Sequence, residues 1–161
     1  MKILQKNIRF MLIMGISVIF SSGQIHAEDL VQANFLPLHA LILNQNISTE
    51  DKLEQMQNLI ARDSFDINTQ DANGKTALNL ATFYKAKPIV IQFFIVNKAN
   101  VNLPDLFNET PLHNAIRNEE ILAAQMLLQA GADKNFKNDK LETPIDLARS
   151  PKTLALFGFE E

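Results

Sequence analysis

The chain has 161 residues, with 15 basic and 18 acidic side chains and a formal charge of −3. This length allows one domain or one short repeat array. The small acidic excess disfavours a nucleic-acid-binding protein, because binding to phosphates requires an excess of Lys and Arg. The absence of cysteine excludes disulfides, thiolate nucleophiles and thiolate zinc sites. An apolar content of 47% excludes global disorder.

Residues 1–27 have the pattern of a secretory signal peptide. Three basic side chains precede the apolar run 10–20, and the segment contains no acidic residue. As a helix this run would span roughly 16 Å, about half of a ~30 Å hydrocarbon core, so a transmembrane anchor is the weaker interpretation. We expect cleavage after Ala27, with cleavage after Gly23 as the alternative. An uncleaved tether is the third interpretation.

Cleavage would change the charge of the protein. The segment contains three basic residues and no acidic one, so the charge of residues 28–161 is −6. An exported, acidic, cysteine-free protein fits a bacterial periplasm better than a disulfide-rich secreted domain. We therefore expect a periplasmic or secreted protein with one folded domain at 28–161.

This domain contains an internal repeat with a period of 33 or 34 residues. Residues 71–81, 105–115 and 138–148 align without gaps, and each segment has a Thr followed five residues later by an Ala. An Asn that ends each preceding unit has the same spacing. These landmarks are Thr76, Thr110 and Thr143, then Ala81, Ala115 and Ala148, and finally Asn68, Asn102 and Asn135. Two independent sets of landmarks with one period indicate a repeat architecture.

The best-preserved segment, residues 110–115, reads Thr-Pro-Leu-His-Asn-Ala and resembles the signature of the ankyrin repeat. The resemblance implies an all-α repeat solenoid of about four helix-turn-helix units joined by β-hairpin-like loops. It covers nearly all of the domain. The units lie at about 35–68, 71–102, 105–135 and 138–159.

The first unit is degenerate, because Leu36 and Leu41 replace the Thr and Ala of the signature. These two leucines are unusual at the end of an array, where the outer face meets water. Either this unit is an irregular cap, or residues 28–35 form an additional helical turn and the two leucines pack under it. Ser48 and Asp51 have the spacing of a helix N-cap pair, which predicts the start of the second helix of this unit.

The second unit begins with a hairpin whose Gly74 suits a positive φ angle. Thr76 is expected to cap the first helix, and an apolar stripe that includes Val90, Ile91 and Phe94 predicts the second. Lys98 stands where the third unit has Gly131, so this helix end loses a residue that adopts a left-handed conformation without strain. Ser64 holds the same position in the first unit.

In the third and fourth units, Asn108 and Leu141 stand where the second unit has Gly74. Asn adopts positive φ more readily than other non-glycine residues, so Asn108 is tolerated there. For Leu141 we expect a different hairpin geometry. The fourth unit is expected to end early, with a short helix at 153–157 after Pro151.

The chain lacks the patterns of a catalytic site. Outside the first 27 residues it has two histidines, His39 and His113, which occupy the same repeat position. The resemblance implies that both imidazoles bond to hairpin backbone. The chain has no metal-binding pair of histidines at helical spacing, no nucleophile motif and no phosphate-binding glycine loop. We therefore expect no enzyme activity, no cofactor and no metal.

The remaining function is binding. In ankyrin arrays the hairpin tips and the exposed faces of the first helices line a concave surface, and the resemblance implies that a partner protein docks there. The corresponding positions of this chain are Ala72, Asn73, Lys75, Phe83, Tyr84, Leu106, Phe107, Glu109, Arg117, Asn118, Asp139, Lys140 and Glu142.

Exposed aromatic residues at these positions would favour an interface. Phe107 either contacts a partner or folds back on the neighbouring hairpin. Phe83 and Tyr84 either contact a partner or bury one ring between the helices. Phe136 is a third candidate.

The sequence thus predicts an exported protein-binding module that serves as an adaptor, stabiliser or inhibitor. The alternative is a bacterial effector that acts on a protein of a eukaryotic host. The expected partner is another protein of unknown identity, not nucleic acid. No stable membrane insertion is expected after signal cleavage, and a monomer is expected.

Overall fold

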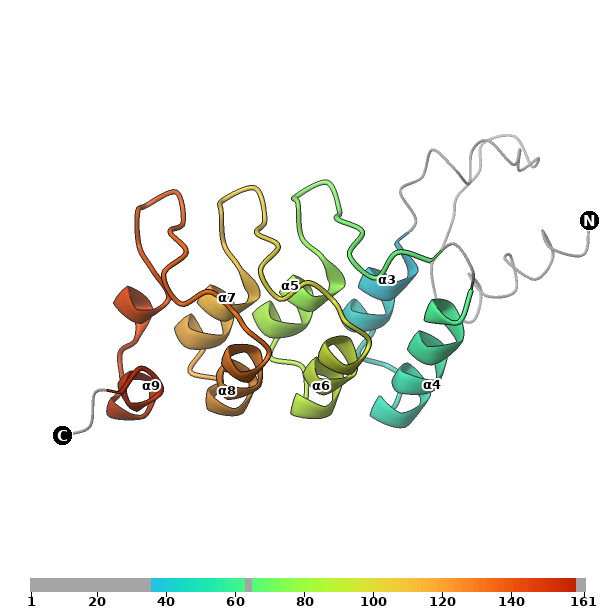
Figure 1. The fold of residues 1–161 in the computed structure, drawn as a ribbon. Helices are drawn as coiled ribbons and strands as arrows, with labels where there is room; N and C mark the ends of the chain where they lie inside the picture. The colour runs from blue at the N-terminus through green and yellow to red at the C-terminus, as the bar shows by residue number, and fades with distance from the viewer. Residues whose placement is uncertain (1–35, 63–64, 159–161) are drawn as a thin grey trace, which may run out of the picture. The chain divides into compact units, whose positions relative to one another are not determined.

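A computed structural model describes residues 36–62 and 65–158. The predicted signal peptide, residues 28–35 and Ser64 lie outside these ranges. Short helices pair along the chain, each pair separated from the next by an extended loop (Figure 1). The elements are α3 (Pro37–Leu43), α4 (Thr49–Ile60), α5 (Ala77–Phe83), α6 (Pro88–Val96), α7 (Pro111–Arg117), α8 (Ile121–Gln129), the 3₁₀ helix η1 (Ile145–Leu147) and α9 (Pro151–Ala155).

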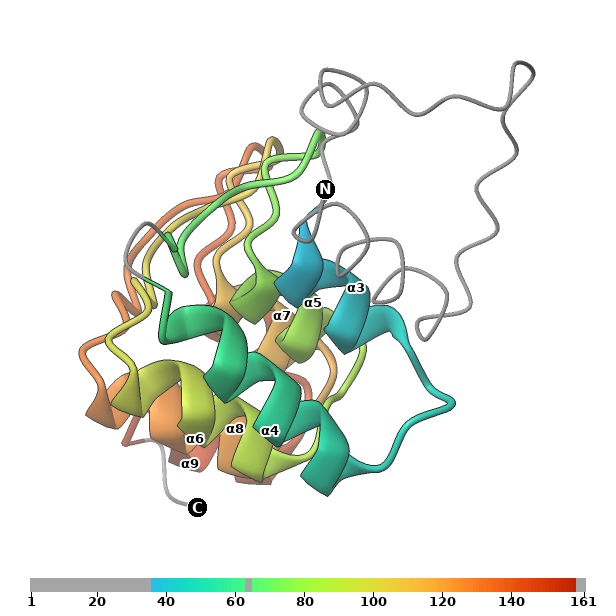
Figure 2. The ribbon, with the colours of Figure 1, turned by 90° about the vertical axis from the view of Figure 1, so that its right-hand side faces the viewer.

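Within residues 36–158, the helices form two layers. The first helix of each pair, namely α3, α5, α7 or η1, lies in one layer, and α4, α6, α8 and α9 lie in the other (Figures 1 and 2). The hairpin loops between the pairs project in a row beyond the first helices. This arrangement confirms the predicted all-α solenoid, and none of the described helices is long and apolar enough to cross a bilayer.

The core lies between the two layers and between successive pairs. The buried residues include the Leu and Ala of the second and third signatures, Leu38 and Leu41 of the first, and the inner stripes of α4, α6 and α8. A single helix pair cannot cover its own apolar face, so each pair buries its neighbours' side chains. The largest completely buried apolar side chains are Leu41, Met56, Leu59, Leu78, Ile91, Phe94, Leu112, Ile116 and Leu127. The interaction of Leu36 and Leu41 with residues 28–35 lies outside the described residues.

Helix starts follow the predicted caps. Thr76 Oγ1 accepts a hydrogen bond from the backbone N–H of Asn79 at 3.1 Å, and Ser48 Oγ accepts one from Asp51 at 3.0 Å. The last helix differs from the prediction, because it begins at Pro151 rather than Thr153. Ser150 accepts a hydrogen bond from the backbone N–H of Thr153, and proline is favoured in a first turn, where its missing N–H has no intrahelical partner.

The three described hairpins share one side-chain device. Asp71, Asp105 and Asn138 open the turns, and the Oδ1 atom of each accepts the backbone N–H groups two and four residues later, at 2.8–3.0 Å. Backbone bonds of 2.9–3.0 Å close each hairpin, as in the bond from Asp71 N–H to Lys75 O. The hairpin conformation is therefore fixed mainly by its first residue.

This device overturns the expectation for Leu141. Its φ angle is 64°, close to the 72° of Gly74 and the 56° of Asn108, and its N–H bonds to Asn138 O at 2.8 Å. The hydrogen bonds of Asn138 hold the fourth hairpin in the common geometry despite the strained leucine. Lys98 likewise adopts a left-handed conformation at the end of α6, with φ of 59°.

Neighbouring hairpins are joined directly. Leu106 N–H donates to Asn73 O at 3.0 Å, and Asp139 N–H donates to Phe107 O at 3.1 Å. A side chain from each first helix adds a second link. His39 Nε2 lies 2.7 Å from Lys75 O, and His113 Nε2 lies 3.2 Å from Glu142 O. The predicted structural role of both histidines is thus confirmed.

In the second unit, Asn79 stands at the position of these histidines. Its Nδ2 donates to Glu109 O at 3.2 Å, so it makes the same link to the next hairpin without an ionisable ring. Burial lowers the pKa of His113 and of His39 below the usual value, since a charged ring would lose its hydration. The neutral imidazole is therefore the form that fits the fold.

Replacement of Leu141 by glycine should stabilise the protein. Glycine adopts positive φ without the steric cost of a Cβ atom, so Leu141→Gly should raise the free energy of unfolding by about 0.5–1 kcal/mol. Chemical denaturation measures the change. Lys140→Gly is the matched control, because Lys140 has no positive φ, and it should lower stability. Equal effects of the two substitutions would contradict the argument.

His113 should make stability dependent on pH. The folded state depresses its pKa, so the unfolded state binds more protons at mildly acidic pH. The contribution of neutral His113 to the free energy of unfolding is complete above about pH 6.5. It is lost as the pH falls toward the lower pKa of the folded state. His113→Asn, which copies Asn79, should reduce the slope of unfolding free energy against pH between about pH 7 and pH 5. An unchanged slope would show that this histidine is not responsible.

Candidate partner-binding cleft

A cleft of about 470 Å³ lies between the hairpins of the second, third and fourth units and the first helices of the second and third units, α5 and α7. It forms because hairpins bonded edge to edge stand beside α5 and α7, whose outward side chains reach toward the tips. Seven predicted site residues line it: Lys75, Phe83, Phe107, Glu109, Arg117, Asp139 and Lys140. Asp105, Asn114 and Asn138 complete the lining.

Two aromatic rings stand at this cleft in contact with solvent. Phe83 is 46% exposed and Phe107 is 63% exposed, so neither ring is buried between helices or against the adjacent hairpin. The Lys75 ammonium lies 5.0 Å from the centroid of the Phe83 ring, within the range of a cation–π interaction. Folding alone does not explain apolar rings at these positions, because they remain hydrated.

Two ion pairs organise the polar part of the cleft. Lys75 pairs with the buried Asp105, and Arg117 Nη2 lies 2.5 Å from Glu109 Oε1. Asn138 Nδ2 donates to the same Glu109 oxygen at 3.0 Å. Residues from α7 and from three hairpins are thereby connected, which restricts the guanidinium and ammonium groups to defined orientations.

One buried amide in the cleft has no partner. Asn114 is 2% exposed, and its Nδ2 makes no hydrogen bond to any described residue. The second carboxylate oxygen of Glu109, Oε2, is also buried without a partner in this part of the chain. The equivalent positions in the neighbouring units are Leu80 and Leu147, both buried. Asn114 therefore places a polar group where the repeat itself requires an apolar one.

Asn114 is not among the site residues predicted from the sequence, although the sequence carries a signal for it. The signature position between His and Ala is Leu in the second unit and Asn in the third. A polar residue at a buried position is informative because its desolvation is unfavourable without a hydrogen bond. Only the packing shows that the position is buried, so the signal becomes clear with the structure.

Six predicted site residues lie outside this cleft. Asn118 Nδ2 donates to Thr82 O and Phe83 O at 3.2 and 3.0 Å, and so connects α7 to the end of α5. Glu142 Oε2 accepts a hydrogen bond from Asn138 Nδ2 at 3.1 Å. Leu106, Ala72 and Asn73 are exposed at hairpin tips. The remaining residue is Tyr84.

Phe136, the third aromatic candidate, is half-buried and packs edge to face against His113, with 6.4 Å between ring centroids.

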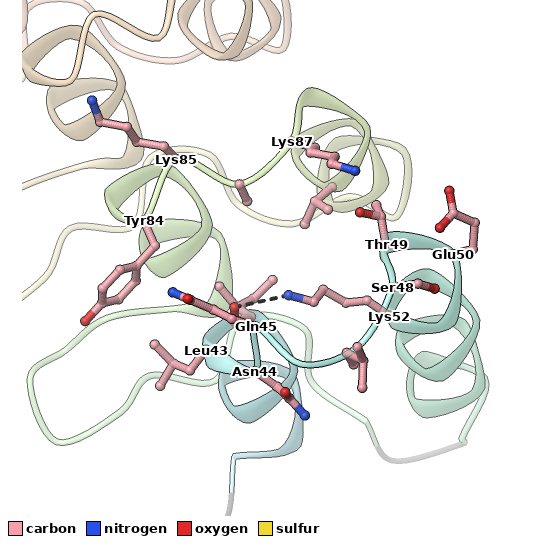
Figure 3. A pocket seen from close by; sticks show the side chains of 14 residues that line it. Leu43, Asn44, Gln45, Ser48, Thr49, Glu50, Lys52, Tyr84, Lys85 and Lys87 are labelled. Atoms are coloured by element: carbon pink, nitrogen blue, oxygen red, sulfur yellow. Dashed lines mark hydrogen bonds between the residues drawn. The ribbon is translucent and has the colours of Figure 1, made fainter.

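Tyr84 instead lines a second pocket, of about 590 Å³, between the link from α3 to α4 and the turn before α6 (Figure 3). Its ring is 53% exposed and meets Phe83 edge to face, with 5.1 Å between centroids. Lys52 Nζ in this pocket donates to Ile42 O at 3.3 Å, and burial lowers the pKa of Lys52. The neighbouring residues Phe83 and Tyr84 thus belong to two different concavities.

The described residues provide no cluster of three or more His, Asp or Glu side chains that could hold a metal ion. The polar groups of the cleft are paired charges and amides, whose established contacts are hydrogen bonds and ion pairs. This arrangement suits recognition of hydrogen-bonding and aromatic groups on another molecule.

Comparison with known proteins identifies the repeat. Residues 43–138 match the family model for ankyrin repeats in three copies. The chain is 30% identical over 118 residues to the ankyrin repeat protein BB_B28 of Borreliella burgdorferi, and this match covers 71% of the chain and 28% of that protein. It is 33% identical over 87 residues to human palmitoyltransferase ZDHHC13, covering 53% of the chain and 14% of the enzyme. The chain thus spans less than a third of the length of these curated relatives.

Among solved structures, the ankyrin repeat domain of Bcl-3 matches with a TM-score of 0.67 and 25% identity, over 76% of this chain and 50% of that one. Ankyrin repeats are protein-binding modules. The family match and the two-layer stack with its joined hairpins show that the chain belongs to the ankyrin repeat family.

Proposed function

We propose that this protein is an exported module that docks a partner protein in the cleft between its hairpins and first helices, and thereby serves as an adaptor, stabiliser or inhibitor. The observation that carries the proposal is the combination of exposed aromatic rings and an unpartnered buried amide in one cleft. The pattern of residues 1–27 supports export to the periplasm or the medium.

The amide of Asn114 supports binding because it is unfavourable for folding. A buried polar group without a hydrogen bond costs about 1–3 kcal/mol, whereas leucine at the same position would contribute apolar burial. Partner binding explains this cost if a partner carbonyl accepts a hydrogen bond from Asn114 Nδ2 after a small shift of the surrounding side chains. The two phenylalanines then supply apolar contact area at the same site.

Asn114→Leu should therefore separate stability from binding. The variant should unfold with a free energy about 1 kcal/mol higher than the wild type, because an unsatisfied group is removed, and it should bind the partner less tightly. Chemical denaturation and a binding assay measure the two effects. Leu147→Asn, the reverse change at the equivalent position, should lower stability. A destabilised Asn114→Leu protein would mean that the amide contributes to the fold.

Capture from cell fractions tests the docking surface. Tagged wild-type protein should retain a partner that Phe107→Asp does not retain, since a carboxylate replaces an apolar contact. Leu141→Asp is the matched control, because Leu141 is also an exposed apolar residue at a hairpin tip but does not line the cleft. Loss of the partner with both variants, or with neither, would exclude the cleft as the docking site. Cell fractionation with N-terminal sequencing of the purified protein tests export separately.

A further inference from the structure

Helix α6 is apolar except for Gln92, although one of its sides faces solvent. Its sequence from Pro88 to Val96 contains Gln92 as its one polar residue. Val90, Ile91 and Phe94 are buried, as the stack requires, but Ile89 and Val96 are 55% and 64% exposed. Packing within the stack thus explains the apolar residues on the inner face of this helix. It does not explain the exposed apolar residues on the outer face.

The apolar face continues on the neighbouring helix α8, which contacts α6. In the repeat alignment, Ile89 corresponds to Leu122, which is 61% exposed. Gln92 corresponds to Gln125, and both are exposed; Phe93 corresponds to Met126, and both are half-buried. The outer faces of α6 and α8 therefore carry similar residues at these three positions, whereas the exposed Val96 corresponds to the exposed Gln129.

The net charges at the N-terminal ends of the second helices alternate in sign, with Lys52 of α4 turned instead to Ile42 O. Glu50 and Asp51 lie in the first turn of α4, and Lys85 and Lys87 precede α6. Glu119 and Glu120 precede α8, and Arg149 and Lys152 flank the start of α9. The two ion pairs found in the described part of the chain, Lys75–Asp105 and Arg117–Glu109, involve none of these groups.

We propose that the outer faces of α6 and α8 form the interface of a symmetric homodimer. A twofold axis parallel to the helices, between α6 and α8, would place α6 of each copy on α8 of the other. Ile89 would then meet Leu122 of the second copy, and Gln92 would meet Gln125. This proposal differs from the monomer expected from the sequence.

The alternating charges fit this symmetry. The same axis brings Lys85 and Lys87 near Glu119 and Glu120 of the second copy, and it brings the acidic end of α4 near the basic end of α9. In the order α4, α6, α8 and α9, the helix starts are acidic, basic, acidic and basic. The axis pairs the first of these with the fourth and the second with the third, so each charged group approaches one of opposite sign. Such charge complementarity favours association with a second copy of this chain, and it favours one relative orientation of the two copies.

The antiparallel alternative is disfavoured by the same charges. An axis perpendicular to the helices would place the start of α6 against the end of α6 in the second copy. Lys87 would then face Lys98, which follows the C-terminal end of α6, and both side chains are exposed. Like charges that meet at an interface are unfavourable, so the parallel arrangement is the one that fits.

The interface is small. Nine-residue helices are about 14 Å long, so two of them with the flanking charges cover less than the roughly 800 Å² per partner of a standard interface. The dimer should therefore dissociate at low protein concentration and weaken in salt. The proposed partner cleft lies in the other layer, with α5, α7 and the hairpins, so it stays open in the dimer and the two proposals can fail independently.

The test is sedimentation equilibrium of protein purified from cells that express the full-length sequence, over about 1 to 300 μM. The wild type should change from monomer to dimer across this range. Ile89→Asn should weaken association about tenfold, since an amide replaces an apolar contact. Leu141→Asn, which removes an exposed apolar residue from a hairpin tip, should leave association unchanged. A wild-type protein that remains monomeric throughout would overturn the proposal.

Two charge variants decide the symmetry. The pair Lys85→Glu with Lys87→Glu leaves acidic groups before both α6 and α8, whereas Glu119→Lys with Glu120→Lys leaves basic groups before both. Each variant alone should associate about tenfold or more weakly than the wild type. An equimolar mixture should form heterodimers with affinity restored, because every contact again joins opposite signs. A mixture that associates no better than either variant alone would overturn the proposed interface.

Discussion

The structure depends on one connection that repeats from unit to unit. A side chain in each of α3, α5 and α7 reaches a carbonyl oxygen of the next hairpin, and the hairpins themselves are joined by backbone hydrogen bonds. These bonds satisfy polar groups that would otherwise lack partners at the junction of two units. They also hold adjacent units in register, so that each helix pair covers the apolar face of its neighbour. The core and the cleft are both consequences of this register.

The cleft illustrates how a regular scaffold acquires a site. The hairpins have one conformation because Asp71, Asp105 and Asn138 fix it, and the resulting row of tips is nearly invariant. Recognition can then be altered by side chains that the scaffold does not require, such as Phe107 and Arg117. Asn114 goes further, since it replaces a residue that would favour folding.

The two layers carry different kinds of surface. The cleft beside the first helices combines paired charges with aromatic rings, whereas the outer faces of α6 and α8 combine exposed aliphatic side chains with glutamines and have charges at the helix ends. Under the two proposals, one surface would bind a partner of different sequence and the other would bind a second copy of the chain. A dimer would present two open clefts, which would increase the strength of binding to a partner that has two sites.

The sequence alone determined the period, the helix pairs, the hairpins and most of the core, because these features depend on local spacing and on residues such as Thr76 and Gly74. It also identified seven of the ten residues that line the cleft. It did not show that Phe83 and Tyr84 face different concavities, that Leu141 adopts the common turn, or that Asn114 is buried without a partner. Spacing tells which residues share a helix face, but whether that face meets a neighbour, a cleft or water depends on how the units stack. The tertiary structure determines the surroundings of each helix face, because burial and hydrogen bonding there depend on residues about 30 positions away in the chain.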